Sequence, residues 1–447
     1  MDSLSNDNIL EIALEIPIYS ISQFCQTSKR FNRIICNNEW FWKQKFIRDH
    51  GEISWTGSWL WLYQNYMNAW SFGFNTFGQL GHSDRISRNI PEQILDLEPK
   101  YVSAGFYHTV VIDLYDNVWM FGNESYYDSI PTQIPNFKAK QVSAGNHTLM
   151  IDFDDNVWTI KTSHMIDNNT VPNQIPDLKA KQVSTGNGCT HSIIIDLNND
   201  IWTFGYNMNG ELGLGDYKNR DVPTKIQRLK AKQVSAGGKH TMFIDLANYV
   251  WAFGSNRYGQ LGINDELNRR RDIPRQIMFL KAKQVSAGGY HTLLIDLDDN
   301  VWAFGNNDEG QLGLGDNERR YSPVQIPNLK AKQVSAGTKH SIVIDLHDNI
   351  WVFGGNLHWQ LGISDNDEYR KYRIIPTLIP NLKAKQASAG FGHSIVIAKQ
   401  LKIDCDNEQL HNETKCNQYH RISGFRRSKS KFPLIGKIST CSMKLRR

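Results

Sequence analysis

HTLLIDLDDNVWAFG, residues 291–305, is one of several near-copies of the same stretch in this chain of 447 residues. It begins with an apolar, β-rich run, continues through Asp299-Asn300 and ends in the alternating sequence Val-Trp-Ala-Phe. Asp and Asn tolerate the left-handed backbone that short turns require, so the stretch predicts two strands joined as a β-hairpin.

Two marks of this stretch recur along the chain. One is a tryptophan followed three residues later by glycine, at Trp70, Trp119, Trp202, Trp251, Trp302 and Trp351, with a seventh copy at Trp158 that has lost the Phe and Gly. The other is Ser-x-Gly followed by a histidine, at His108, His147, His191, His240, His291, His340 and His393. Both marks return every 39 to 53 residues. Repeats of this length with strand patterns are typical of β-propeller blades.

Each repeat unit predicts about four short strands, the content of one blade. Gly-Gln-Leu-Gly marks a second turn, and Pro-x-x-Ile-Pro-Asn-Leu then leads into Lys-Ala-Lys-Gln-Val-Ser-Ala-Gly. Trp70 has no Ser-Ala-Gly-x-x-His half before it, and His393 has no Trp half after it. We expect residues 395–398 to pair beside residues 70–72, so that both halves complete one blade and close the ring without exposed edges.

The pattern Gly-x-x-His, aliphatic residues and Val-Trp-x-Phe-Gly-x-Asn-x-x-Gly-Gln-Leu-Gly resembles the repeats of the RCC1 family over residues 68–398. The resemblance implies an all-β, seven-bladed β-propeller that binds other proteins and is not an enzyme. Repeats of that family usually carry Asp-Gly at the hairpin turn, where this chain has Asp-Asn. The units around 119–139 and 158–178 also lack Gly-Gln-Leu-Gly, so we expect short outer connections there.

Residues 1–66 change from strand patterns to helical ones. Ser5 can cap a helix in which the apolar residues at 9, 10, 13 and 14 recur at helical spacing. The aromatic stretches 39–47 and 58–66 predict two more helices. We therefore expect a small helical domain before the propeller.

The order of features in residues 2–50 resembles an F-box: Leu4-Ser5, then ILEIAL, then QTSKRFNRIIC and a late tryptophan. The resemblance implies that these helices dock on a Skp1-like adaptor of a ubiquitin ligase. The adaptor-binding side chains that it implies are Leu4, Ile9, Leu10, Phe24, Phe31 and Trp42. The alternative is a helical bundle that only shields one side of the propeller.

The recurring histidines and the cysteines do not predict a reaction centre. Each histidine belongs to its own unit, so equivalent atoms lie around a ring, and we expect each to hydrogen-bond its own turn rather than to bind metal. The spacing of Cys405, His411, Cys416 and His420 matches no zinc signature. No Ser-His-Asp spacing, Walker loop or His-Glu-x-x-His occurs. We therefore expect no catalytic residue, metal or cofactor.

Positive charge is concentrated at the end of the chain. Residues 399–447 hold 12 Lys or Arg against 4 Asp or Glu, a net charge of +8, while the rest has a net charge of −3. We interpret this segment as a basic, disordered tail after a propeller that spans 67–398. Its Arg-Arg-Ser-Lys-Ser-Lys sequence at 426–431 is either a nuclear-import or nucleic-acid patch or a solubilising end. The near-neutral body predicts no nucleic-acid binding elsewhere, and the repeated Lys-Ala-Lys reads as a ring of solvated lysines.

The sequence predicts a protein of the cytoplasm or nucleus. It contains no apolar run of 18 residues, which argues against a membrane span, and no secretory signal. Its six cysteines are too few and too scattered for a disulfide scaffold.

The residues between Gly and His differ from unit to unit where the rest of the repeat is nearly constant. Equivalent loops emerge on one face of a propeller, and a varied rim of aromatic and lysine side chains suits protein binding. The target-binding residues predicted in this way are Phe106, Tyr107, Lys239, Tyr290, Lys339 and Phe391. The alternative is drift of unconstrained surface loops.

Two functions follow from the two resemblances. The first is a substrate-recognition subunit of a Skp1-cullin-F-box-type ubiquitin ligase, with a protein substrate that the sequence does not name. The second is a guanine-nucleotide exchange factor or regulator of a Ran-like small GTPase. The helical N-terminus favours the first. Ultraviolet sensing, a third role in the RCC1 family, uses a Trp between Gly and His, and no Trp stands there in this chain.

Overall fold

The computed structural model describes residues 6–15, 34–35, 38–50, 58, 67–95, 97–122, 129–160, 171–188, 191–364 and 371–400. Leu4, Phe24, Phe31, most of the stretch 58–66 and everything after residue 400 lie outside the described residues. The interpretation of the tail and the domain boundaries at 66 and 398 therefore stay predictions.

Two helices occur in the described part of the N-terminal region: α1 (Asn6–Glu15) and α4 (Glu39–His50). In α1, Ile9 and Ala13 are buried, as the helical spacing predicts. Asn38 caps α4, because its side-chain oxygen accepts a hydrogen bond from the backbone N–H of Phe41 at 3.0 Å. Phe41 and Trp42 are fully buried, with their rings 5.0 Å apart. Helical structure is thus present, while the identification as an F-box stays a prediction.

The stretch 291–305 forms the predicted hairpin. Strand β17 (His291–Asp296) pairs antiparallel with β18 (Asn300–Gly305), with Ile295 opposite Val301. Asp299 has a φ of 72°, the left-handed conformation that the turn requires. Asp296 holds the hairpin together: its carboxylate accepts hydrogen bonds from the backbone N–H of Asn300 at 2.8 Å and from the Trp302 indole at 2.9 Å. The repeated Asp and Trp are therefore partners within one hairpin.

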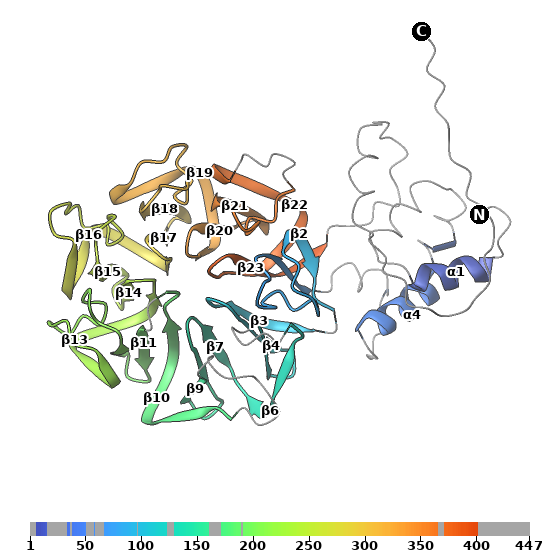
Figure 1. Ribbon diagram of the computed structural model, residues 1–447, viewed down its shortest axis with the longest axis horizontal. Helices are drawn as coiled ribbons and strands as arrows, with labels where there is room; N and C mark the ends of the chain where they lie inside the picture. The colour runs from blue at the N-terminus through green and yellow to red at the C-terminus, as the bar shows by residue number, and fades with distance from the viewer. Residues whose placement is uncertain are drawn as a thin grey trace, which may run out of the picture. The chain divides into compact units, whose positions relative to one another are not determined.

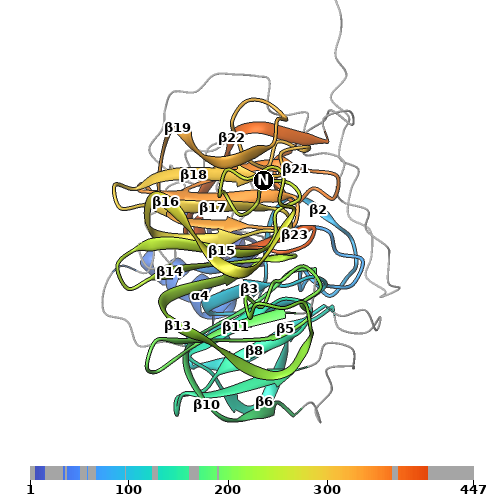
Figure 2. The same ribbon diagram turned by 90° about the vertical axis from the view of Figure 1, so that its left-hand side faces the viewer.

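A long strand connects most hairpins to the next. The first part of β19 (Arg320–Ala336) pairs with β18, and its last part pairs with β20 (His340–Asp345). The same arrangement recurs around the ring in Figure 1, and Figure 2 shows it from the side. The strands that complete it are β3 (Pro99–Ala104), β4 (Thr109–Asp113), β5 (Asn117–Phe121), β6 (Thr132–Lys138), β7 (Gln141–Ala144), β8 (Thr148–Ile151), β9 (Asn156–Ile160), β10 (Asn173–Thr185), β11 (His191–Asp196), β12 (Asp200–Gly205), β13 (Arg220–Ala236), β14 (His240–Asp245), β15 (Tyr249–Ser255), β16 (Arg270–Ala287) and β21 (Asn349–Gly355). In the first part of the ring two shorter strands, β2 (Arg88–Gln93) then β3 or β6 then β7, make the connection.

The two ends of the repeat array pair with each other. Strand β1 (Asn68–Gly73) lies between β2 (Arg88–Gln93) and β23 (His393–Gln400), and β23 pairs in turn with β22 (Tyr372–Ala389). Trp70 is opposite Val396, and all pairings in this sheet are antiparallel. The described residues between 67 and 400 thus form a closed, all-β propeller, as predicted. The number of blades and the F-box-like domain stay predictions.

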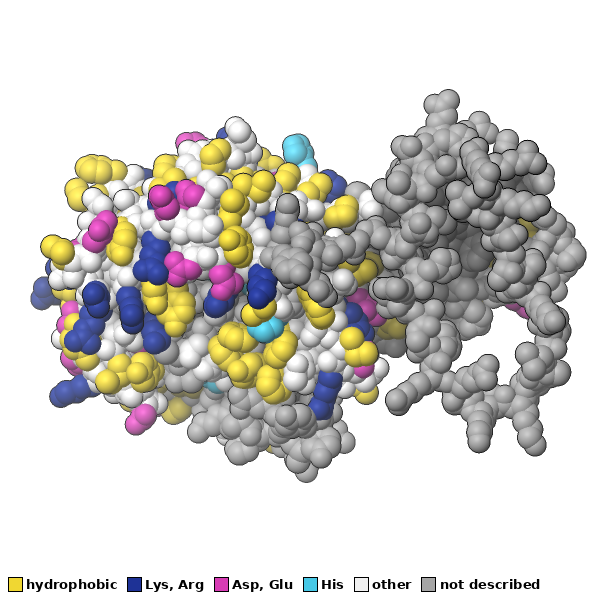
Figure 3. Space-filling model, turned by 45° about the horizontal axis from the view of Figure 1, so that its top comes forward, with side chains coloured by type: hydrophobic (Ala, Val, Ile, Leu, Met, Phe, Trp, Pro, Cys, Tyr) yellow, Lys and Arg dark blue, Asp and Glu magenta, His cyan; other side chains and the backbone are white. Residues whose placement is uncertain are grey.

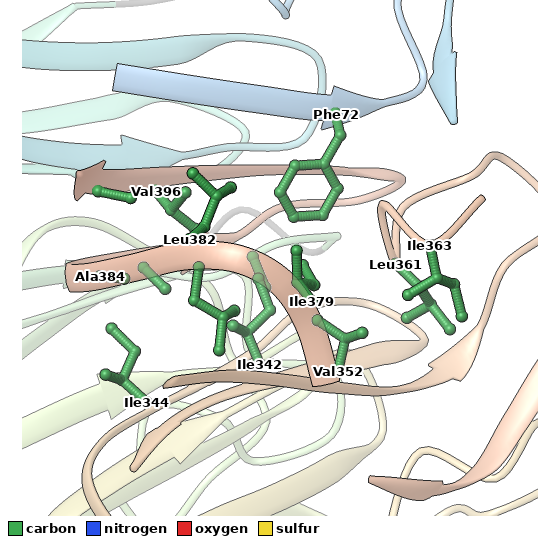
Figure 4. Close-up of a cluster of buried hydrophobic side chains, with 14 residues drawn as sticks. Phe72, Ile342, Ile344, Val352, Leu361, Ile363, Ile379, Leu382, Ala384 and Val396 are labelled. Carbon is green, nitrogen blue, oxygen red and sulfur yellow. The ribbon is translucent and has the colours of Figure 1, made fainter. Parts of the chain in front are cut away.

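The core lies between neighbouring blades. In the cluster drawn in Figure 4, Ile344 and Val352 of one blade pack against Val396 and Phe72 of the next. The second glycine of Gly-Gln-Leu-Gly makes room for such packing: a Cβ on Gly313 would lie 2.9 Å from the ring of Phe353 in the following blade. The recurring tryptophans are only half-buried at the rim of these clusters. The sheets thus supply each other's apolar cover, as a four-stranded blade cannot do alone.

A closed ring of side-chain hydrogen bonds joins every blade to the next. In each step, Nε2 of the recurring histidine lies 2.8 to 2.9 Å from the hydroxyl of a Ser or Thr in the following blade. The pairs are His108–Thr148, His147–Ser192, His191–Thr241, His240–Thr292, His291–Ser341, His340–Ser394 and His393–Thr109. The expectation that each histidine side chain bonds its own turn is therefore wrong, because the imidazole reaches across the blade boundary.

The hydroxyl in this relay has a second partner. Thr292 donates to the carbonyl of Gln260 at 2.9 Å, and the same bond recurs in the units that follow the other Gly-Gln-Leu-Gly turns, the Gly-Glu-Leu-Gly turn and the Trp-Gln-Leu-Gly turn. A hydroxyl that donates to a carbonyl must accept from the histidine, so Nε2 carries the proton. In these five steps the buried histidine is the donor and the hydroxyl is its acceptor.

The segment Gln-Val-Ser-Ala forms further bonds between blades. The side-chain amide of Gln284 accepts from the backbone N–H of Val334 at 3.1 Å and donates to its carbonyl at 3.3 Å. The Ser286 hydroxyl accepts from the backbone N–H of Ala336 at 2.9 Å. Equivalent serine bonds occur at every blade boundary. This part of the repeat is constant because it holds the blades together.

The ring predicts that the propeller loses stability in acid. Burial lowers the pKa to about 4 at His147 and to about 3 at His108, His240, His291, His340 and His393. An unfolded chain protonates these imidazoles near pH 6.5, so it binds more protons than the folded chain below that pH. Each histidine should remove about 1.4 kcal/mol of stability per pH unit between about pH 6 and 4. Urea unfolding followed by circular dichroism at stepped pH measures this slope.

Replacing one histidine of the ring measures how much that histidine contributes to proton uptake on unfolding. H291Q should lower the number of protons taken up on unfolding by about one. H347Q, which removes an exposed imidazole outside the ring, is the matched control. An H291Q slope equal to that of the unmodified chain would contradict the assignment.

Candidate functional site

Two sets of loops meet at one end of the strands. The Gly-x-x-His loop ends at the start of one hairpin strand, and the loop after Trp-x-Phe-Gly begins at the end of its partner. Backbone bonds tie them together: Ser255 N–H donates to the Lys239 carbonyl at 2.8 Å, and Phe74 N–H donates to the Gly392 carbonyl at 2.8 Å. We call this end of the propeller the loop face and the opposite end, with the Asp/Asn turns, the hairpin face.

Three of the predicted target-binding residues lie together on the loop face. The rings of Phe106 and Phe391 are 4.3 Å apart, and those of Phe106 and Tyr107 are 4.4 Å apart. Phe77 extends the group, with its ring 4.5 Å from that of Tyr107. Each of these side chains is half-buried. They form a continuous apolar surface where the first repeat meets the last.

Phe74 and His358 complete this surface. Their rings are 4.9 Å apart, and the His358 ring is 6.3 Å from that of Phe391. Burial, and secondarily the charge of Lys339, lower the pKa of His358, so this imidazole is neutral at neutral pH. We define Phe74, Phe77, Phe106, Tyr107, His358 and Phe391 as the aromatic patch. In Figure 3, hydrophobic side chains gather around a histidine on the visible face, with Lys and Arg side chains nearby.

The backbone beneath the patch is fixed. The N–H of Phe391 donates to the Gly105 carbonyl at 3.1 Å, and the N–H of Phe106 donates to the Gly145 carbonyl at 3.0 Å. These bonds link the loops of successive blades around the axis. The aromatic side chains therefore stand on a rigid base, which lowers the entropy cost of binding.

The other predicted target-binding residues are not part of the patch. Tyr290 stacks edge-on against Tyr258 at 5.2 Å, and the guanidinium of Arg319 lies 4.7 Å over the Tyr258 ring. Lys339 pairs with Glu309 at 2.5 Å. Lys239 lies on a neighbouring loop near Glu211, whose pKa is raised by burial. These side chains add a polar sector with charges of both signs to the loop face.

Sequence reasoning missed Phe74, Phe77, His358 and the adjacent Trp359. Trp359 occupies the first glycine position of Gly-Gln-Leu-Gly; it has a φ of 62° and is 49% exposed. A bulky residue in this conformation costs about 1 to 3 kcal/mol. At the equivalent position, a Cβ on Gly310 would lie 2.7 Å from the Ile374 backbone. The signal was present in the sequence, because Leu-His-Trp-Gln-Leu-Gly departs from the chain's own repeat.

No group of three or more His, Cys, Asp or Glu side chains among the described residues is placed to hold a metal ion. Cys405, His411, Cys416 and His420 lie outside the described residues. In the same part of the chain, no helix has the length and apolar character needed to cross a membrane.

The helical region places only part of the predicted adaptor-binding set. Ile9 and Trp42 are buried, and Leu10 is half-buried. The Lys45 ammonium donates to the carbonyl of Leu14 at 3.1 Å, which links α4 to the end of α1. Ile9 and Trp42 thus belong to the small core of these helices rather than to its surface.

Comparison with known proteins identifies the repeats. The family model described as the regulator of chromosome condensation (RCC1) repeat matches residues 68–112, 198–244, 248–295 and 298–344. The ultraviolet-B receptor UVR8 of Arabidopsis thaliana is 28% identical over 259 residues, which are 55% of this chain and 51% of that protein. The X-linked retinitis pigmentosa GTPase regulator of Homo sapiens is 30% identical over 131 residues, 29% of this chain and 8% of that protein. The chain spans about half the length, or less, of these curated relatives.

Solved structures show the same fold. Human WBSCR16 superposes with a TM-score of 0.65 at 18% identity, over 75% of this chain and all of that one. Yeast RCC1 (Prp20), solved bound to Kap60, superposes with a TM-score of 0.66 at 17% identity, over 78% of this chain and 95% of that one. The chain therefore contains RCC1 repeats folded as an RCC1-like propeller.

The left-handed conformation of Trp359 predicts that replacing this residue by glycine stabilises the protein. Restoring the chain's own repeat with W359G removes the left-handed Trp and should raise the unfolding midpoint, because half of its side chain is exposed. Thermal unfolding followed by circular dichroism measures the effect. A loss of more than about 1 kcal/mol on W359G would instead make Trp359 a structural residue.

Proposed function

We propose that this chain is a seven-bladed RCC1-type propeller that catalyses no reaction of its own and regulates a small GTPase by binding it on the loop face. The observation that carries the proposal is the aromatic patch with the neighbouring strained Trp359. The target-binding role of Phe106, Tyr107 and Phe391 is part of the proposal.

The composition of the patch supports protein binding. Aromatic side chains dominate the energetics of protein interfaces, and anchors on a rigid base lose little entropy on binding. Trp359 holds a bulky side chain in the left-handed conformation, and 49% of the residue is exposed. Exposed strain of this kind is found at binding sites, where the partner supplies the missing contacts.

Similarity supports a GTPase as the partner. One relative is named a GTPase regulator, and another chain of this fold, Prp20p of Saccharomyces cerevisiae, was solved in a study of its binding to Gsp1p and histones. The polar sector beside the patch carries charges of both signs, because Arg319 pairs with Asp308 and Lys339 pairs with Glu309. It adds groups that can form polar contacts at the rim of an interface.

A second candidate is the ubiquitin-ligase adaptor. It is supported by the packing of α1 against α4, since a helical module before a repeat domain suits a chain that joins two partners. Under this proposal, residues 2–50 bind a Skp1-like adaptor and the aromatic patch holds the substrate. Leu4, Phe24 and Phe31, with half-buried Leu10, would then provide most of the adaptor contact.

The test uses the purified full chain and a Ran-like small GTPase in its GDP, GTP and nucleotide-free forms. Titration calorimetry should detect binding, and the chain should change the rate at which labelled nucleotide leaves the GTPase. The double variant Y107A/F391A should weaken binding by about 30-fold or more, the loss expected for two interface anchors.

W359G and F279N form a matched pair for the same titration. Both remove a bulky residue from the left-handed conformation, but Phe279 lies on the outer strand β16, away from the patch. W359G should weaken binding, and F279N should leave it unchanged. Failure to bind any form of the GTPase, together with capture of a Skp1-like adaptor, would replace the first proposal with the second.

A further inference from the structure

The hairpin face carries a ring of exposed apolar side chains. Among the described hairpins, the residue six positions after the recurring histidine is Leu or Phe each time. These side chains are between 46% and 55% exposed: Leu114, Phe153, Leu197, Leu246, Leu297 and Leu346.

The fold does not require apolar residues at this position. Hairpin turns usually carry polar residues, and the next residue in each turn varies freely, with Tyr115, Asp154 and Ala247 among the examples. The preceding Asp satisfies the turn backbone, as Asp296 does for Asn300. The same position carries a half-exposed apolar side chain in six hairpins. We infer that this side chain has a role outside its own blade.

The ring has one gap, in the blade that joins the two ends of the array. The equivalent position there is Lys399, next to the last described residue, Gln400. In the same sheet, β1 begins at Asn68, opposite Ala398. Both described ends of the propeller therefore lie at the gap.

In four of the six hairpins, a Lys–Asp ion pair lies beside the apolar residue; in the hairpins of Leu197 and Leu246 the lysine bonds Asn199 or Asn248 instead. Lys100 pairs with Asp116 at 2.5 Å, and Lys140 pairs in the same way with Asp155. Lys283–Asp299 and Lys332–Asp348 repeat this arrangement on the other side of the ring. The sequence predicted solvated lysines here, but Lys140, Lys283 and Lys332 each form an ion pair with an aspartate. The face carries a self-complementary pattern in which a lysine of one copy can meet an aspartate of another.

We propose that the hairpin face is a self-association surface, on which two copies of this chain stack ring against ring. A second copy presents apolar side chains at the same radius and spacing, a match that an unrelated partner would have to reproduce. The alternating Lys and Asp give the two copies opposite charges to pair around the apolar ring. The stack leaves both loop faces open, so this inference is independent of the proposed function.

Sedimentation velocity of the full chain across the micromolar range tests the proposal. The unmodified chain should sediment as a dimer. The double variant L197N/L297N places a common turn residue at two ring positions and should raise the dimer Kd by about tenfold or more. Because these side chains are exposed, the thermal midpoint should stay unchanged, which separates lost association from lost folding.

L267N is the matched control. Leu267 is also an exposed leucine, at 93%, but it lies in the loop between β15 and β16 at the other end of the strands. L267N should dimerise like the unmodified chain. An unmodified chain that stays monomeric, or an L197N/L297N chain that dimerises normally, overturns the proposal. A dimer broken by Y107A/F391A instead would also overturn it and assign the contact to the loop face.

Discussion

The hydrogen bond from each recurring histidine to the hydroxyl of the next blade is the interaction on which the propeller depends. A single four-stranded blade has two apolar faces and no core of its own. The histidine relay fixes how far and at what angle the next blade stands, because imidazole, hydroxyl and turn carbonyl must align within about 3 Å of one another. The apolar packing and the Gln and Ser bonds then act on blades already in register. The histidine–hydroxyl hydrogen bond occurs at every blade boundary, including the one between the last and the first repeat.

The propeller could be predicted from the sequence, because units with nearly the same residues form the same strands and turns. The hairpin turn at Asp299, the core strands and the pairing of β1 with β23 follow from patterns within single units or at the ends of the array. The partner of each histidine could not be predicted in this way. A repeat pattern shows that His291 has equivalents in the other units, but not whether its side chain bonds its own blade or the next.

The candidate site was predictable only in part, for a related reason. Phe106, Tyr107 and Phe391 are distinctive because they interrupt a nearly constant repeat, but their contact requires the first and last units to be adjacent. Tyr290 has the same signature in the sequence, yet it lies apart with Tyr258. The variation between Gly and His in the repeats therefore identified the loop face. The closure of the ring determined which of these residues lie together. The N-terminal resemblance rests on residues of which only a few are described, so it contributes a hypothesis rather than a site.

Ring closure also constrains how a cell can make this protein. The strand that completes the first sheet, β23, is the last of the propeller to leave the ribosome, more than 300 residues after β1. At about 5 to 20 residues per second, the growing chain spends on the order of 15 to 60 seconds as an open arc. During that time β1 lacks its neighbour and the Thr109 hydroxyl lacks His393. Synthesis therefore exposes an unpaired strand edge and apolar blade faces, and the nascent chain is a substrate for chaperones until its final repeat emerges.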